Sequence, residues 1–575
     1  VETAASVDGQ IMPPVMGAAA FLMVEYVGIP YTQIIKHAAL PALMSYIALF
    51  YIVHLEACKS DIRGIPRDYI APLQNRILNM LMTVSGVIVL AAAIYYGLGW
   101  IKDLAGEASV FIIAALMLAT YIALMKYESA YPELQLDDPN EPILKCPEAG
   151  PTVKSGLHFL LPVAALIWNL MIEELSPALS AFWATMFLVF ILITQRPLSA
   201  FFRGYQGLGT YVEQGFSDLK VGLVAGARNM IGVAIATSTA GIIVGTVTLT
   251  GIGLVLAEFV ELISAGNLFI MLGMVAFASL ILGMGVPTTA NYIIVSSLMA
   301  PVVVELGAQS GLIVPLIAVH MFVFYFGIMA DVTPPVGLAA YAAAGIAKAD
   351  PLVTGFTAFW YSIRTSVLPF MFIYNTQLLL IDIGSIPEFL LVVASAIVAS
   401  LVFVAASQHW FVVRNRWYET IIMLVVAFSL FRPNFWMDMV YPPYNTVSPT
   451  DLMQRVESAR EGKRLRVWVE GEDANGDPVR KGMMISLTET GSAAERLDKF
   501  GLRLLPMGGQ VDVTSVKFRS RAEKAGFRQG QKITDIEVET DRPDPAWTFI
   551  PTLGVLGLIY MLQRRRREAE EGASA

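Results

Sequence analysis

Two clusters of small polar residues, each beside prolines or glycines, interrupt long apolar segments of the chain. Residues 283–291 read GMGVPTTAN and residues 330–335 read ADVTPP. Glycine and proline break helices, and a helix broken inside a bilayer leaves free carbonyls at one broken end and free amides at the other. Carbonyls with Thr or Asn oxygens suit Na⁺, whereas the amide end suits an anion such as a carboxylate. The two clusters therefore predict a cation site beside an organic anion.

Candidate ligands for both charges lie in these clusters, directly after the second one, and near the start of the chain. The substrate is expected to contact Thr288, Thr289, Asn291, Pro335 and Gly337. The predicted Na⁺ site uses side chains or carbonyls of Gly9, Gln10, Pro13, Gly283, Gly285, Val286, Thr288, Asp331 and Thr333. Asp331 is ionisable at membrane depth, and either a cation site or a cap for the helix starting at Pro334 explains it. We favour the cap for the Asp331 side chain and ion coordination for Thr333. A packing kink whose hydroxyls bond to their own helix is the alternative for the cluster at 283–291.

A short phrase relates the second cluster to the start of the chain. Pro13-Pro14-Val15 returns 321 residues later as 334–336, and Pro30 and Pro351 keep the same register. In the first copy Asp8, Gly9 and Gln10 supply the polar groups. Paired broken helices in corresponding halves indicate the binding site of a secondary transporter. Chance similarity in an Ala/Gly/Pro-rich chain is the alternative.

The composition indicates an all-α polytopic membrane protein. Of 575 residues, 56% are hydrophobic and 15% charged, and the mean hydropathy is +0.61. A soluble domain is about a quarter charged. Two cysteines, Cys58 and Cys146, are too few for a disulfide framework. The apolar runs are long enough to cross a bilayer, and the predicted spans are 32–55, 77–98, 108–126, 155–172, 178–195, 229–250, 267–284, 311–330, 357–382, 386–406, 417–431 and 547–562.

Lys and Arg placement orients these spans and defines four regions. Arg63, Arg67 and the run 564–567 mark cytoplasmic ends. The regions are a transmembrane transport domain (1–382), additional transmembrane helices (383–432), an extracytoplasmic soluble domain (433–546), and a last transmembrane helix with a basic cytoplasmic tail (547–575). Residues 203–228 are expected to form a helix at the membrane interface.

The extracytoplasmic domain has its own pattern. Strand-like pieces occur at 464–470 and 532–539, and Ala525-Gly526-Phe527 precedes the second. An Ala-Gly turn before an apolar strand resembles the PDZ fold, which binds peptides by adding a strand to a sheet edge. The region is thus predicted to be a small α/β PDZ-like domain, and a structural cap without a ligand is the alternative.

Isolated charged groups carry weaker predictions. Arg228 and Arg364 lie near span ends, where their side chains are expected to reach the interface. A clamp on a substrate carboxylate is the alternative for both. His320 lies in an apolar span and is expected to be a hydrogen-bonded core residue rather than a proton relay.

Segments 9–21, 284–291, 330–340 and 345–351 resemble the large membrane subunit of TRAP transporters, most closely the fused permeases of the TAXI subclass. The resemblance implies inverted-repeat helical hairpins of the ion-transporter-like elevator fold and a multi-pass protein of the bacterial inner membrane. It implies Na⁺-driven import of a small organic acid, such as a dicarboxylate, delivered by a TAXI-type periplasmic substrate-binding protein. The Na⁺ sites of the family correspond here to 285–291 and 331–337, with a contribution from 9–14. Asp8 departs from the small neutral residue expected there. The resemblance also predicts that an N-terminal region is missing, so that this chain alone should not transport.

Two other functions are alternatives to transport, one enzymatic and one not. An intramembrane protease combines spans with a PDZ-like domain, but zinc hydrolysis requires a His-Glu-x-x-His helix, which the five scattered histidines do not form. A membrane-anchored sensor or assembly protein needs no broken helices. We therefore predict a permease, not an enzyme, with no catalytic residue and no nucleic-acid partner. Protons remain the alternative to Na⁺ as coupling ion. The substitutions Thr289→Ala and Asn291→Ala are expected to weaken Na⁺-dependent uptake.

Overall fold

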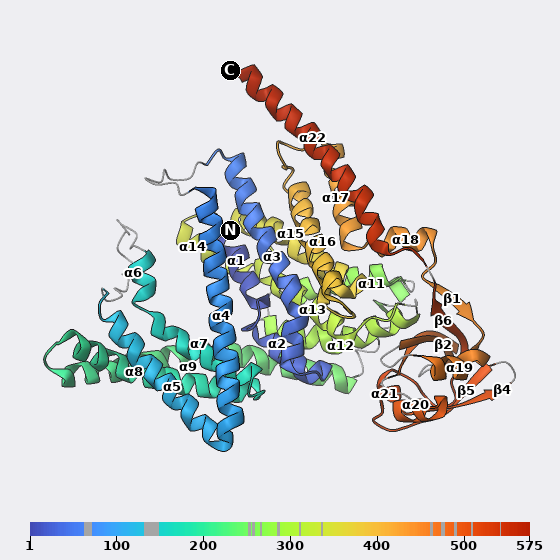
Figure 1. The fold of residues 1–575 in the computed structure, drawn as a ribbon, viewed down its shortest axis with the longest axis horizontal. Helices are drawn as coiled ribbons and strands as arrows, with labels where there is room; N and C mark the ends of the chain where they lie inside the picture. The colour runs from blue at the N-terminus through green and yellow to red at the C-terminus, as the bar shows by residue number, and fades with distance from the viewer. Residues whose placement is uncertain are drawn as a thin grey trace. The chain divides into compact units, whose positions relative to one another are not determined.

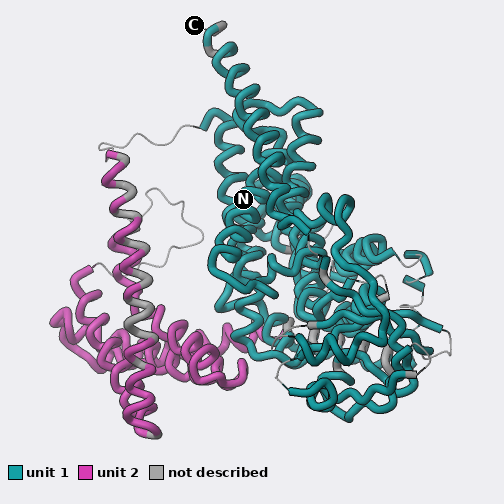
Figure 2. The backbone as a smooth tube through the Cα atoms, turned by 45° about the vertical axis from the view of Figure 1, so that its right-hand side comes forward, with its two compact units in different colours: residues 1–62, 233–575 teal, residues 63–232 magenta. Residues whose placement is uncertain are grey.

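The structure is a computed structural model that is mostly helical. It describes all residues except 63–71, 132–148, 251–254, 256–258, 261, 265–266, 284–287, 310–311, 335–336, 460–463, 473–477, 488–490, 508–509, 541 and 575. Six described helices are long and apolar enough to cross a membrane, or seven if the bent pair α17 (Trp417–Phe431) and α18 (Asn434–Val440) forms one span. Figure 2 shows two compact units, residues 1–62 with 233–575, and residues 63–232. The chain is a polytopic helical membrane protein, as the composition predicted.

The first unit contains the repeat as two equivalent series of helices (Figure 1). The first series is α1 (Glu2–Asp8), η1 (Gly9–Ile11), α2 (Ala18–Val27) and α3 (Tyr31–Lys59). The second is α13 (Leu316–Met329), η4 (Ala330–Val332), α14 (Leu338–Ala347) and α15 (Pro351–Tyr374). A shift of 321 residues carries η1 onto η4 and the end of α1 onto the end of α13. The repeat is therefore structural, and the chance interpretation is wrong.

The two series run in opposite directions. His37 Nδ1 near the start of α3 lies 2.7 Å from the Leu379 carbonyl, just after α15. Further along α3, Ser45 Oγ lies 3.0 Å from Thr365 Oγ1 in the middle of α15. Residue numbers that rise along α3 therefore meet numbers that fall along α15. Since α3 and α15 are equivalent helices, their antiparallel packing confirms that the repeat is inverted.

The second unit is helical. Its helices are α4 (Leu73–Ala105), η2 (Gly106–Ala108), α5 (Ser109–Glu128), α6 (Ala149–Lys154), η3 (Leu157–Phe159), α7 (Leu160–Met171), α8 (Pro177–Arg203) and the first part of α9 (Leu208–Thr250). A single helix, α9, is continuous over 43 residues where two separate elements, at 203–228 and 229–250, were predicted. Its glycines lower helix propensity, but the helix contains no proline, which is the stronger helix breaker.

The first unit also contains a hairpin of two helices, α11 (Leu268–Gly283) and α12 (Thr288–Gln309). The apolar pattern predicted a span at α11 but none at α12, although α12 is a spanning candidate with a mean hydropathy of 1.5. The span was not predicted because polar residues at the beginning of α12 precede its apolar run. After η5 (Thr376–Leu379), α16 (Ile386–Ser407) packs along α3 and α17.

Between α18 and η7 (Pro545–Thr548) the chain forms a six-stranded antiparallel domain. Its strands are β1 (Tyr444–Val447), β2 (Arg464–Glu472), β3 (Pro478–Ser486), β4 (Leu502–Met507), β5 (Gln510–Val516) and β6 (Lys532–Glu539). The order is β3-β2-β6-β5-β4, with β1 also on β6. The helices η6 (Pro449–Asp451), α19 (Leu452–Ser458), α20 (Ala493–Phe500) and α21 (Arg521–Lys524) accompany the sheet. Val467, Ile485, Phe527 and Ile533 are among its buried core residues. Both predicted strands, 464–470 and 532–539, are confirmed.

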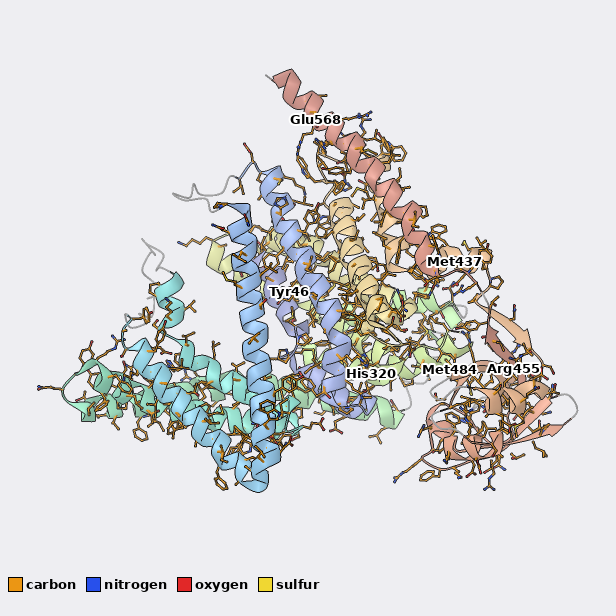
Figure 3. The ribbon with its side chains drawn as sticks, in the orientation of Figure 1. Tyr46, His320, Met437, Arg455, Met484 and Glu568 are labelled. Atoms are coloured by element: carbon orange, nitrogen blue, oxygen red, sulfur yellow. The ribbon has the colours of Figure 1, made fainter. Side chains whose placement is uncertain are left out.

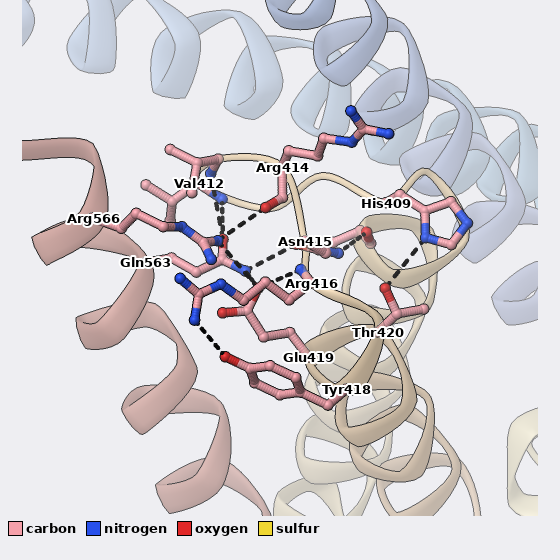
Figure 4. A network of polar contacts seen from close by, with 12 residues as sticks. His409, Val412, Arg414, Asn415, Arg416, Tyr418, Glu419, Thr420, Gln563 and Arg566 are labelled. Carbon is pink, nitrogen blue, oxygen red and sulfur yellow. Dashed lines mark hydrogen bonds and ion pairs between the residues drawn. The ribbon is translucent and has the colours of Figure 1, made fainter. Parts of the chain in front are cut away.

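The two tethers of this domain are joined to each other at their far ends. One tether is α17, and the other is α22 (Phe549–Ser574), which follows η7 (Pro545–Thr548). Gln563 of α22 is fully buried, and its amide donates to Asn415 Oδ1 and Glu419 Oε2, both at 2.9 Å. Its carbonyl oxygen accepts the Val412 amide at 3.0 Å. Figure 4 shows this network, which fixes α22 to α17 and the preceding loop.

Candidate functional site

Three interrupted segments of the first unit meet at the carboxylate of Asp331. Thr288, the first residue of α12, donates its hydroxyl to Asp331 Oδ2 at 3.0 Å. Gln10 of η1 donates its side-chain amide to the same oxygen at 3.4 Å. Asp331 itself lies in η4. One acidic group therefore joins the hairpin to both copies of the inverted repeat.

The predicted capping role of Asp331 is wrong. The N-cap of α14 is Gly337, and no side chain caps this helix. Gly337 has φ of +29° and donates its amide to the Thr333 carbonyl at 3.1 Å. Because an irregular turn separates η4 from α14, the Asp331 carboxylate is directed to the hairpin instead. The carboxylate is thus available to the site.

The Thr333 hydroxyl bonds back to its own helix. Its Oγ1 donates to the Met329 carbonyl at 2.7 Å. A Thr hydroxyl that bonds to the carbonyl four residues earlier is satisfied by its own helix. A role for Thr333 in cation binding stays a prediction, and so does substrate contact by the partly exposed Thr289.

Asn291 offers an acceptor that nothing in the described structure uses. Its side chain is 1% exposed, and Nδ2 donates to the Ser279 carbonyl of α11 at 2.9 Å. Its Oδ1 is buried without a hydrogen-bond partner among the described residues. Buried polar oxygens normally have a partner, because leaving one unpaired costs about 1–3 kcal/mol. An unpaired amide oxygen next to the helix break has the chemistry of a Na⁺ ligand.

Glycine at position 283 allows α11 and α12 to approach each other closely. A Cβ atom at Gly283 would lie 2.5 Å from Asn291 Nδ2 and would also collide with the Ala330 side chain. Gly327 of α13 faces the same group, because its own Cβ would lie 3.5 Å from Asn291 Nδ2. The small residues therefore let α11, α12 and α13 pack at the break. Three predicted site residues, Gly285, Val286 and Pro335, lie outside the described residues.

The first copy of the repeat contributes Gln10 to the site at Asp331, whereas its Asp8 bonds to Arg364. Gly17 packs against the Gln10 side chain, and its amide donates to the Gln10 carbonyl at 2.8 Å. A Cβ at Gly9 would be 3.8 Å from the Tyr46 hydroxyl, in ordinary contact. Pro13 lies in the irregular turn before α2. The role of Gly9, Gln10 and Pro13 in Na⁺ binding stays a prediction.

Asp8 forms a buried ion pair that sequence reasoning missed. Asp8 and Arg364 are 1% and 4% exposed and are bonded to each other. Ser45 Oγ donates to Asp8 Oδ2 at 2.9 Å, and Thr365 Oγ1 lies 3.3 Å from Oδ1. The prediction that Arg364 reaches the interface is wrong, because a buried acid of the other copy neutralises it. Polar Ser45 within an apolar helix was the available signal.

His320 is a hydrogen-bonded core residue, as predicted. Its Nδ1 lies 2.7 Å from the Tyr292 hydroxyl of α12, and Tyr26 of α2 faces both rings. Figure 3 shows His320 and Tyr46 within the helices of the first unit. The site therefore joins the hairpin with both copies of the repeat at two levels, Asp331 and His320.

Broken helices in an inverted repeat, inside a polytopic helical protein, are the architecture of a secondary transporter. Among the described residues no three His, Cys, Asp or Glu side chains are grouped to hold a metal ion.

The chain belongs to a family described as the DctM component of the tripartite ATP-independent periplasmic transporters, whose sequence model matches residues 1–122 and 108–389. A second model, for a domain of unknown function called DUF3394, matches residues 389–569. No curated protein sequence matches the chain. The resemblance to the large TRAP subunit is thereby confirmed. The chain is a TRAP permease subunit and not an enzyme, and its family works with a substrate-binding protein and a small-molecule substrate.

Proposed function

We propose that this permease subunit imports a small organic acid by Na⁺-coupled symport across the bacterial inner membrane. The acid is delivered by a periplasmic substrate-binding protein of the TAXI type. The family match supports the transport role, and the fusion of a DctM region to the DUF3394 region supports the TAXI assignment.

The shared carboxylate of Asp331 is the observation that carries the proposed coupling. It lies at the beginning of α12, bonded to the hydroxyl of Thr288. The amide end of a helix attracts anions, so the substrate carboxylate and Asp331 compete for the same positive region. In a medium of low dielectric constant, two like charges this close repel strongly. A bound cation neutralises Asp331, and the organic anion then binds.

This arrangement makes the binding of the two ligands mutually dependent. If a cation raises the affinity for the acid, the acid raises the affinity for the cation by the same factor. The unpaired Asn291 Oδ1 provides a neutral oxygen for Na⁺ near the carboxylate. A proton on Asp331 would neutralise the same charge without that oxygen, so proton coupling is the second candidate.

An elevator mechanism accounts for the two-unit organisation. In such a mechanism one body carries the site across the membrane while another stays fixed. The broken helices and the hairpin all belong to the unit of residues 1–62 and 233–575, whereas residues 63–232 form a second compact unit. We assign the first unit to the moving body and the second to the scaffold.

Uptake by the complete protein in proteoliposomes tests the proposal. Purified substrate-binding protein and a panel of labelled dicarboxylates and amino acids are supplied outside, with an imposed Na⁺ or proton gradient. We expect a Na⁺ gradient to drive accumulation of at least one acid, and a proton gradient alone to fail. Accumulation driven by protons without Na⁺ would replace sodium with the second candidate. Absence of uptake under either gradient with every acid would refute the proposal.

A further inference from the structure

The charges of the extracytoplasmic domain are divided between two parts of its sequence. Residues 496–532 contain nine Lys or Arg and three Asp or Glu, whereas the rest of 433–546 contains eight and fifteen. The basic part comprises β4, β5, α21 and the end of α20. Asp498, one of its three acids, pairs with Arg503 at 3.4 Å and Lys517 at 2.7 Å. The basic part therefore keeps a positive excess on a chain whose net charge is −8.

An exposed phenylalanine lies in the middle of this basic part. Phe518 is 80% exposed in the loop between β5 and α21, with Lys517 and Arg519 on either side. The Arg519 guanidinium lies 5.4 Å from the centre of its ring. Aromatic and Arg side chains dominate the binding energy of protein interfaces. We call the exposed residues Arg503, Lys517, Phe518 and Arg519 the Phe518 face.

The loop that presents Phe518 is held in place from both sides. The Lys517 amide donates to the Gly501 carbonyl at 2.9 Å, and the Arg519 amide donates to the Glu523 carboxylate. Gly501 has φ of +100°, and a Cβ atom there would collide with Ser520. A fixed loop loses little conformational entropy when a partner binds. The Phe518 face is therefore preorganised.

The Phe518 face lies away from the membrane attachments of the domain. Figure 1 shows α20 and α21 at the opposite end of the domain from α18 and the start of α22. The attachment end instead exposes Trp436 and Trp547, at 40% and 64%. Tryptophan is enriched where proteins cross the membrane interface. The Phe518 face is therefore turned to a soluble partner and not to lipid.

We propose that the Phe518 face is the docking surface for an acidic face of the periplasmic substrate-binding protein. This inference rests on the proposed function, which supplies that soluble partner. The same domain packs against the transport core, because β3 contacts α12 and Lys481 pairs with Glu305 near the end of α12. A binding protein docked on the domain is thereby attached to the body that carries the hairpin.

Binding of the purified substrate-binding protein to the complete permease in nanodiscs tests the docking surface. The variant Phe518→Ser/Arg503→Glu removes the aromatic anchor and reverses one charge, both at exposed positions. We expect its dissociation constant to rise at least tenfold, and high salt to weaken binding of the unmodified protein more than that of the variant. The matched control Glu457→Gln changes an exposed charge in α19 of the same domain and should leave the affinity unchanged.

Two further measurements keep the outcomes distinct. The thermal unfolding temperature of the variant should equal that of the unmodified protein, because both side chains are exposed. Uptake by the variant should fall at low concentrations of binding protein and recover at saturating ones. Equal affinity of variant and unmodified protein would overturn the docking inference while leaving transport intact. Lack of uptake by the unmodified protein, in contrast, would contradict the proposed function itself.

Discussion

Gln10 and Asp331 occupy the same position in the two copies of the repeat and are hydrogen-bonded to each other at 3.4 Å. Equivalent residues of an inverted repeat meet only where its pseudo-twofold axis passes. A second equivalence supports this. Ser45 bonds to Asp8 at the end of α1, and its counterpart Ser366 lies 2.6 Å from the sulfur of Met329, the counterpart of Asp8. The two copies therefore share a fold and a contact pattern, but they differ in charge.

Replacing Asp331 with Asn should uncouple uptake from the cation. The neutral amide keeps the size but removes the charge that a cation neutralises, so the Na⁺ dependence of uptake should flatten. Loss of hydrogen bonds to a charged group costs about 1.5–3 kcal/mol, so initial rates should fall about 10–100-fold. Initial rates over a Na⁺ and a pH series measure this. The control Asp350→Asn alters an N-cap whose Oδ1 accepts the Val353 amide, and Asn also caps helices. An unchanged Na⁺ titration in Asp331→Asn would exclude Asp331 from coupling.

Asn291→Ala should raise the Na⁺ concentration needed for half-maximal uptake. The substitution removes the unpaired Oδ1 and the bond from Nδ2 to Ser279. The expected shift is about tenfold, since a lost interaction of about 1.4 kcal/mol changes an equilibrium constant by that factor. Ser297→Ala on the same helix is the control, because its hydroxyl bonds only to the Ile293 carbonyl of its own helix. Identical Na⁺ curves for both variants would remove Asn291 from the cation site.

Gly283→Ala should abolish uptake and lower the yield of folded protein. The new methyl group would collide with Ala330 and lie 2.5 Å from Asn291 Nδ2, so α11 cannot keep its distance from η4 and α12. Overpacking a close contact costs about 1–3 kcal/mol. Gly273→Ala in the same helix is the matched control, because no other described part of the chain lies within 4 Å of a Cβ there. Size-exclusion profiles and uptake of the two variants provide the comparison, and equal behaviour would contradict the close packing.

Asp8→Asn should destabilise the protein strongly, because it leaves the buried guanidinium of Arg364 without a counter-charge. Breaking a buried ion pair by removing one partner costs about 3–5 kcal/mol. The double variant Asp8→Asn/Arg364→Met should be less destabilised than the sum of the single variants. Unfolding in detergent by denaturant measures all four proteins. Additive effects in this cycle would mean that Asp8 and Arg364 do not interact.

Gln563→Ala should loosen the connection between α17 and α22, the two tethers of the six-stranded domain. It leaves the Val412 amide and the Glu419 carboxylate without one partner each (Figure 4). Each buried unpaired group costs about 1–3 kcal/mol, so hydrogen exchange of residues 409–420 should speed up. The neighbouring Arg564→Ala, which removes only an exposed pair with Glu568, should leave exchange unchanged. Equal exchange rates in both variants would show that the Gln563 network does not hold the tethers.

The local chemistry of the chain was sufficient to predict its class and its broken helices. Proline pairs at 13–14 and 334–335 remove amide donors wherever they occur, so the interruptions follow from the residues themselves. The exact 321-residue register predicted the repeat, and apolar length predicted helices such as α3, α16 and α17. Alternation and turn residues predicted β2 and β6. The single helix α9 and the helix α12 were missed, because glycine content and a polar first turn resemble helix ends locally.

Only the tertiary structure decided which groups the buried carboxylates of Asp331 and Asp8 bond to. Asp331 has the same local sequence whether it caps α14 or faces the hairpin, and the packing of α12 against η4 selects the hairpin. Asp8 and Arg364 are 356 residues apart, so no local rule connects them. A charge buried among helices takes the nearest opposite charge, and that neighbour is set by how the helices pack. The sequence thus determined where the backbone breaks and which groups lie there, whereas the inverted packing of the two copies determined which groups meet.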